Sequence, residues 1–206
     1  MSINYVALGD SSAVGVGASR GGGYPERLAS RLRQGGRPVG LTNLGMSGAV
    51  VRDVVTSQLK RAVAVQPTLV TLGIGVNDLW RGTALEDFRD DLDRIARRLK
   101  PTGASLVVVN IPDMALAPVA RLVPSHLYEG RIEPFNEAIT SVARAHGMHV
   151  VDLYSASREF IPVRPEFFSF DGFHPSDVGY TRMAEHFWPV LLQAAERVPS
   201  TAQATG

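Results

Sequence analysis

The stretch YVALGDSSAVGVG, residues 5–17, decides how the rest of the chain is interpreted. Its apolar start, from Tyr5 to Leu8, is typical of a buried strand, and the run ends directly in Gly9, Asp10 and Ser11. In open α/β sheets, ligands bind beyond the carboxyl ends of the strands. Ser11 is therefore expected at a functional edge, provided that other strands bring suitable partners there.

Four further apolar runs repeat this pattern along the chain. The five runs cover residues 4–8, 39–44, 68–74, 105–111 and 149–153. Helical patterns lie between them, at residues 25–32, 51–63, 85–99, 132–142 and 180–191. This alternation predicts a parallel sheet with helices on both faces. Thr83 and Glu86 form a capping-box pattern for the third helix, and Pro189 is expected to kink or shorten the last one.

Length and composition indicate one ordinary globular domain. We expect it to span residues 1–197 and to be followed by a frayed tail at 198–206. The 21 Lys and Arg residues balance 20 Asp and Glu residues without a run of like charge, which argues against a nucleic acid or a polybasic membrane contact as partner. The absence of cysteine excludes disulfide, thiolate and Cys-zinc chemistry. With no signal-peptide pattern and no apolar run long enough to span a bilayer, a cytoplasmic location is favoured, and a secreted protein without its leader is the alternative. The oligomeric state cannot be read from the sequence.

Polar residues that could do chemistry follow four of the five runs. They are the groups Gly9-Asp10-Ser11, Asn43 to Gly48, Gly75 to Asp78, and Asp171 to His174. A serine hydroxyl becomes a nucleophile when a base takes its proton, and that base works best when a third group orients it. The DGFH segment supplies both, because Asp171 and His174 are three residues apart across a glycine. Ser11, His174 and Asp171 are therefore the predicted nucleophile, base and orienting acid.

Ester cleavage also needs hydrogen-bond donors at the developing oxyanion. The candidates are the amides of Ser11 and Gly48 and the side chain of Asn77, although Gly45 is also available in the second group. Asp10 and Asp78 are interpreted as residues that hold their turns. The remaining four histidines lack carboxylate partners at metal-ligand spacing, so neither a metal ion nor a cofactor is expected.

At these residues the sequence resembles the SGNH hydrolases, also called GDSL esterases and lipases. Gly9-Asp10-Ser11, Gly48, Asn77 within GVND, and Asp171 with His174 match that family's four blocks in order, although Ser12 stands where the family name has leucine. The resemblance runs from about Tyr5 to the last helix. It implies a flavodoxin-like three-layer α/β/α sandwich with a five-stranded parallel sheet, and serine-dependent hydrolysis of small-molecule esters or thioesters without a metal.

Two long connections, residues 112–130 and 154–173, could wall an apolar pocket for small or medium acyl groups or could simply cover the edge of the sheet. The predicted substrate contacts are Leu79, Trp80, Met114 and Phe170. Aromatic side chains also stack on sugars, so a carbohydrate O-acetyl esterase is an alternative.

Two hypotheses from other classes are a nucleotide-binding α/β domain and a non-catalytic binding module. Gly15, Gly17 and Gly21 imitate a dinucleotide fingerprint, but they begin six residues after the strand end. Gly17 to Gly21 also satisfies G-x-S-x-G, yet no strand leads into Ser19 and no helix follows it directly, so Ser19 is interpreted as a loop residue.

Overall fold

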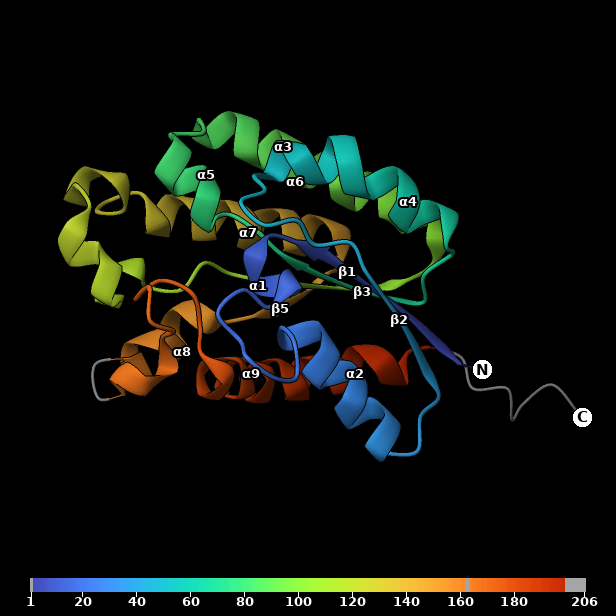
Figure 1. The fold of residues 1–206 in the computed structure, drawn as a ribbon. Helices are drawn as coiled ribbons and strands as arrows, with labels where there is room; N and C mark the ends of the chain where they lie inside the picture. Colours follow the sequence, from blue (N-terminus) through green and yellow to red (C-terminus); the bar gives the residue numbers. More distant parts are fainter. Residues whose placement is uncertain (1, 162–163, 199–206) are drawn as a thin grey trace, which may run out of the picture.

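A parallel sheet of five strands forms the centre of the molecule (Figure 1). The structure is a computed structural model that describes residues 2–161 and 164–198. Its strands are β1 (Ile3–Gly9), β2 (Val39–Asn43), β3 (Leu69–Gly73), β4 (Ser105–Val109) and β5 (His149–Val151). All five lie within two residues of the predicted runs, in the order β2-β1-β3-β4-β5. The predicted five-stranded parallel α/β fold is confirmed.

Two helical layers cover the sheet. One face carries α3 (Val51–Asp53), η1 (Val54–Gln58), α4 (Leu59–Ala64), α6 (Leu85–Leu99) and α7 (Ile132–His146), with α5 (Val76–Arg81) at its end. The other face carries α2 (Tyr24–Gln34), α8 (Leu153–Phe160) and α9 (Asp177–Glu196). In Figure 1 the first group lies above the sheet and the second below it.

In the inner strands β1, β3 and β4, alternating side chains pack against one or the other of these two layers. In β1, Val6 and Leu8 join the core under α6 and α7, whereas Tyr5 and Ala7 join the core under α2 and α9. All four are fully buried. A strand buried on both faces reads as a continuous apolar run, which explains why the sequence pattern located the strands well.

The remaining elements are short. A one-turn helix, α1 (Ser11–Val14), follows β1. Single 3-10 turns are η2 (Lys100–Thr102), η3 (Met114–Leu116), η4 (Pro118–Leu122), η5 (Ser125–Leu127) and η7 (Pro165–Phe167). The long connections predicted at 112–130 and 154–173 are thus partly helical, and α8 occupies much of the second.

Some details differ from the sequence prediction. The helix predicted at 51–63 contains a π turn, η1, and the helix α6 starts after Ala84 with no side-chain cap, so the capping box of Thr83 and Glu86 is not formed. Helix α9 runs for 20 residues through Pro189, so the proline does not shorten it. Residues 199–206 of the predicted tail lie outside the described residues.

Candidate active site

Ser11 stands at the end of β1, at the switch point of the sheet. The order β2-β1-β3 means that the chain leaves β1 toward one edge of the sheet and leaves β3 toward the other, which opens a crevice between these two strands. Gly9 is required there: its φ is +140°, and a Cβ on it would lie 2.1 Å from the carbonyl oxygen of Gly73 on β3. Ser11 is the first residue of α1 and is 6% exposed.

The side chain of Gln58 fixes this strand end from the π turn η1. Its Oε1 accepts a hydrogen bond from the amide of Gly9 at 2.9 Å, and its Nε2 donates to the carbonyl of Gly9 at 2.8 Å. The widened turn of a π-helix inserts one extra residue into the helix, and Gln58 is the last residue of that turn. Gln58 could not be identified from the sequence, because a polar residue on an otherwise amphipathic helix gives no signal of its own.

The predicted nucleophile, base and acid are brought together. The hydroxyl of Ser11 lies 3.0 Å from Nε2 of His174, and Nδ1 of His174 lies 2.6 Å from Oδ2 of Asp171. These residues come from opposite ends of the chain, 163 positions apart. The arrangement is the one in which an imidazole can take a proton from the hydroxyl while a carboxylate orients the ring.

A hairpin-like loop presents His174. Phe168 and Pro175 form an antiparallel bridge, and the amide of Ser169 donates to the carbonyl of His174 at 2.8 Å. Inside this loop, Oδ1 of Asp171 accepts hydrogen bonds from the amides of Phe173 and His174, each at 2.9 Å, and from the hydroxyl of Ser169 at 2.8 Å. The loop is thus built around the carboxylate of Asp171.

Burial by itself raises the pKa of Asp171, but the hydrogen bonds from the His174 ring, the two amides and the Ser169 hydroxyl outweigh it and hold that pKa well below its usual range. The carboxyl is therefore ionised at neutral pH, as an orienting acid must be.

Asp10 holds the turn that carries Ser11, as the sequence predicted. Its Oδ1 accepts from the amide of Ser12 at 2.9 Å and from the hydroxyl of Ser12 at 2.8 Å, which makes Asp10 the N-cap of α1. Burial is the main influence on its pKa, which is raised. Ser12, which departs from the family name, thus contributes a hydrogen bond and not an apolar contact.

The candidate oxyanion donors differ in how they are engaged. Within the described residues, the amides of Ser11 and Gly48 have no protein acceptor, whereas the amide of Gly45 donates to Oδ1 of Asn43 at 3.0 Å. Nδ2 of Asn77 donates one hydrogen to the carbonyl of Ala49 at 3.0 Å, which leaves its second hydrogen available. This bond ties the segment carrying Gly48 to the helix carrying Asn77.

Asp78 also connects α5 to the backbone that follows Gly48. Both of its carboxylate oxygens lie within hydrogen-bond distance of the amide of Val51, at 3.2 and 3.1 Å. Burial is the main reason that the pKa of Asp78 is raised, to about 6, and the bond from Val51 opposes that shift. The side chain is fully buried, in agreement with the structural role predicted for it.

An apolar pocket opens beside Ser11 and His174. Its volume is about 120 Å³, and its far wall is made by α8, η7 and α9. Apolar lining residues include Ile111, Met114, Leu153, Phe160, Phe168 and Met183. Ile111 and Leu153 follow β4 and β5 closely, a position that could have identified them from the sequence.

The four predicted substrate contacts separate into two groups. Met114 lines the pocket, whereas Trp80 does not line it and packs at a tilt against Phe173, a lining residue, with ring centroids 4.8 Å apart. Leu79 does not line the pocket, because the helical turn of α5 directs it into the core, where it is fully buried. Phe170 does not line it either, because it lies at the tip of the His174 loop and is fully exposed. Of the four predicted contacts, Met114 is the one that lines this pocket.

Within residues 2–161 and 164–198, no three His, Asp or Glu side chains are grouped as metal ligands would be. In the same part of the chain, every helix is too short or too polar to cross a membrane.

Known proteins share this architecture. Residues 7–182 match the GDSL-like lipase/acylhydrolase family. Esterase TesA of Pseudomonas aeruginosa is 25% identical over 190 residues, which are 90% of this chain and 86% of that relative. A crystal structure of TesA has a TM-score of 0.78 at 23% identity and covers 93% of this chain and 99% of its own. The lipase/acylhydrolase from Enterococcus faecalis also has a TM-score of 0.78, at 22% identity, over 96% of this chain and 99% of its own.

At these identities, the two solved structures bear on the fold alone. The family match is independent of them and covers most of the chain, including the segments of Ser11, Gly48, Asn77 and His174. This chain therefore belongs to the GDSL-like lipase/acylhydrolase family, and it is a carboxylic ester hydrolase.

Proposed function

We infer that the protein cleaves its ester substrate through an acyl-enzyme formed on Ser11. The observation that carries this inference is the 3.0 Å distance between the Ser11 hydroxyl and Nε2 of His174. In the first step, His174 takes the hydroxyl proton while Oγ attacks the ester carbonyl, and Asp171 stabilises the imidazolium that forms. The same ring then gives the proton to the departing alcohol.

The negative charge on the carbonyl oxygen needs donors that are already in place. The amides of Ser11 and Gly48 and the free hydrogen of Asn77 Nδ2 are suited to this role because no other protein group engages them within the described residues. Loss of one such donor typically lowers the rate by a factor on the order of 10² to 10³. Gly45 is a poorer candidate, since its amide is already bonded to Asn43.

Release of the acyl group repeats the chemistry with water. A water molecule at the place of the departed alcohol loses its proton to Nε2 of His174 and attacks the acyl carbonyl. The tetrahedral intermediate then collapses, the proton returns to Oγ of Ser11, and the carboxylic acid leaves.

The size and lining of the pocket favour a short to medium apolar acyl group. An apolar cavity of about 150 Å³ holds a benzene molecule of six carbons. The pocket beside Ser11 has a volume of about 120 Å³ and is lined mainly by aliphatic and aromatic side chains. We therefore expect the best substrates to carry acyl chains of about four to six carbons.

The test begins with p-nitrophenyl butyrate and Ser11→Ala. This variant is expected to lose at least about 10³-fold in kcat, because the remaining groups cannot form the acyl-enzyme. Ser125→Ala, which removes an exposed hydroxyl from η5, is the control and keeps the parent rate. Equal rates for the parent and Ser11→Ala would overturn the mechanism.

The same assay then follows acyl length from acetate to decanoate, beside acetylated xylan and a butyryl thioester. We expect kcat/KM to peak between butyrate and hexanoate. Met114→Ala shortens a side chain that lines the pocket, so the acyl length with the highest kcat/KM should increase. A maximum at acetate or on acetylated xylan, unchanged in Met114→Ala, would favour a carbohydrate O-acetyl esterase instead.

A further inference from the structure

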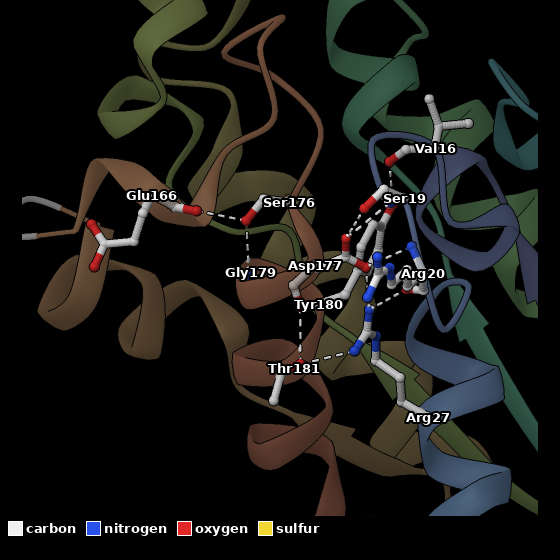
Figure 2. Close-up of polar contacts among 10 residues, drawn as sticks. All are labelled: Val16, Ser19, Arg20, Arg27, Glu166, Ser176, Asp177, Gly179, Tyr180 and Thr181. Atoms are coloured by element: carbon white, nitrogen blue, oxygen red, sulfur yellow. Dashed lines mark hydrogen bonds and ion pairs between the residues drawn. The ribbon is translucent and has the colours of Figure 1, made fainter.

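The glycine-rich loop after α1, residues 15–23, is hydrogen-bonded to a carboxylate from the far end of the chain, that of Asp177. Asp177 is the first residue of α9, and its Oδ2 accepts hydrogen bonds from the amide and the hydroxyl of Ser19 at 3.0 and 2.5 Å. Its Oδ1 accepts from the amide of Arg20 at 3.0 Å and from Nη2 of Arg27 at 2.9 Å. Figure 2 shows these bonds converging on Asp177. The four donors leave neither carboxylate oxygen without a partner.

Arg27 connects three elements at this point. It reaches from α2 to Asp177, donates through Nη2 to the carbonyl of Arg20 at 2.8 Å, and donates through Nη1 to the hydroxyl of Thr181 at 2.9 Å. The loop is therefore joined to α2 on one side and to the first turn of α9 on the other. We call Ser19, Arg27 and Asp177 the loop clamp.

The clamped loop touches the base of the reaction. At Gly17, where φ is +92°, a Cβ would lie 2.6 Å from the carbonyl oxygen of Pro175 and 2.9 Å from Cβ of His174. The backbone of the loop thus lies directly against His174, only three residues before Asp177. A side chain at position 17 would push the two segments apart.

Tyr180 joins the nucleophile to the same helical turn. It lies three residues after Asp177 on α9, is fully buried, and donates from its hydroxyl to the carbonyl of Val16 at 2.8 Å. The carbonyl of Ser11 is 3.4 Å from the same hydroxyl. The first turn of α9 therefore contacts the segment that follows Ser11, at Val16 and Ser19 (Figure 2), and it begins three residues after His174.

We propose that Asp177 is a positioning residue for ester hydrolysis, and that through the loop clamp it holds His174 at hydrogen-bond distance from Ser11. The proposal rests on the mechanism proposed above. It assigns a role to the GASRG segment at residues 17–21, whose serine is neither a nucleophile nor a bystander. Ser19, Arg27 and Asp177 do not line the acyl pocket, so the clamp acts on the chemical step and not on acyl binding.

The charge on Asp177 persists under assay conditions. The hydrogen bond from Ser19 is the main reason that the pKa of Asp177 is lowered, to about 2, and the amides and Arg27 add to it. The hydrogen bonds of the loop clamp to the ionised carboxylate of Asp177 are therefore formed at every pH at which an esterase is usually assayed. The effect of the clamp should be the same across that range.

The test compares Asp177→Ala with the parent and with Glu185→Ala. Glu185 also forms an exposed ion pair on α9, with Arg182 at 2.9 Å, but has no contact with the loop. Two rates are measured: hydrolysis of p-nitrophenyl butyrate, and labelling of Ser11 by a small fluorophosphonate. The end-point of labelling counts the folded sites, whereas the labelling rate reports how well His174 activates Ser11.

We expect kcat and the labelling rate of Asp177→Ala to fall about 10- to 100-fold, the loss typical of a displacement of about 1 Å. The KM, the labelling end-point and all values for Glu185→Ala should stay within about twofold of the parent by the same argument. A lower end-point with an unchanged labelling rate would show a merely structural role and overturn the proposal. So would parent-like kinetics.

A second variant keeps the test decisive if Asp177→Ala does not fold. Ser19→Ala combined with Arg27→Ala removes the side-chain donors and leaves α9 intact, and it should reproduce the loss in rate. Parent-like rates in this double variant would also overturn the proposal. Failure of the clamp is distinguishable from failure of the mechanism, because only the second would leave Ser11→Ala as active as the parent.

Discussion

At the scale of single residues, the environment of each carboxyl decides what it does. Asp171 and Asp177 each accept four hydrogen bonds, and the pKa of each is lowered. Asp10 and Asp78 lie beneath the site, accept fewer bonds in a drier environment, and have a raised pKa. Asp171 and Asp177 can therefore act as charged groups at the surface of the site, whereas Asp10 and Asp78 hold the buried turns beneath it.

The first prediction concerns Asp78. Its pKa in the folded protein, about 6, is above the ordinary value of 3.8, so the protonated form is favoured by folding. Its contribution to stability is fully present below about pH 4 and is lost as the pH rises through 6. Asp78→Asn does not titrate and keeps an acceptor for the amide of Val51. Relative to this variant, the parent should lose on the order of 2 kcal/mol between pH 4 and pH 7.

Urea unfolding of both proteins at several pH values measures this difference. Other titrating groups are common to the two proteins, so they largely cancel from the comparison. If the difference in unfolding free energy is the same at pH 4 and pH 7, Asp78 is not held in an environment that disfavours its charge.

At the scale of elements, an irregular helix serves the site better than a regular one. The π turn η1 lies between α3 and α4, and Gln58 at its end satisfies both backbone groups of Gly9. Gln58 is 1% exposed, so these groups have no access to water as a substitute. The strand end that precedes Ser11 is thus secured by an element that is distant in sequence.

The second prediction follows from this contact. Gln58→Leu keeps an apolar body of similar size but removes the partner of the buried N–H of Gly9, whereas the carbonyl of Gly9 keeps the hydrogen bond from the amide of Met46 at 3.0 Å. A buried donor without a partner costs about 1 to 3 kcal/mol, and we expect the unfolding free energy to fall by about that amount. The kcat for p-nitrophenyl butyrate should also fall in the fraction that remains folded, because Ser11 is two residues from Gly9.

Ser57→Ala is the matched control, because Ser57 lies on the same turn and is exposed. Its stability and rate should match the parent. Unfolding free energies from urea titration and rates at low urea give both quantities. A Gln58→Leu protein as stable as Ser57→Ala would mean that Gly9 finds other partners.

At the scale of the whole molecule, the site exists only when both helical layers are in place. The segment with Gly48 and Asn77 rests on the α6 side of the sheet, whereas α9, which follows His174, belongs to the opposite layer. The two cores share the sheet, since β1, β3 and β4 each contribute side chains to both. We therefore expect the layers to unfold together.

The third prediction uses the two tryptophans. Trp80 packs against the core under α6 and Trp188 against the core under α9, where Arg31 lies 4.2 Å from its ring. In Trp188→Phe the tryptophan fluorescence comes from Trp80 alone, and in Trp80→Phe it comes from Trp188 alone. In each variant, the fluorescence transition in urea should coincide with the loss of far-ultraviolet circular dichroism, as for a single two-state domain. If the fluorescence of Trp80 changes at a lower urea concentration than the circular dichroism, the layer that contains α6 unfolds first instead.

The sequence by itself determined the sheet and predicted which polar groups meet at its edge. Buried parallel strands are continuous apolar runs, so five runs located five strands. Polar residues directly after two of these runs indicated Ser11 and Asn77, and the spacing within the DGFH segment indicated Asp171 and His174. Both signals are local, because each depends on residues within a few positions of one another. They therefore need no knowledge of how distant segments pack.

Only the tertiary structure decided how those groups are supported. The sequence did not predict that Leu79 is buried and Phe170 exposed. Nor did it predict the hydrogen bonds between Gln58 and Gly9 and between Ser19 and Asp177. The bond from Ser19 to Asp177 spans 158 positions. Such contacts depend on which faces the helices turn toward the sheet and how closely they pack there, and no local pattern of residues encodes that geometry.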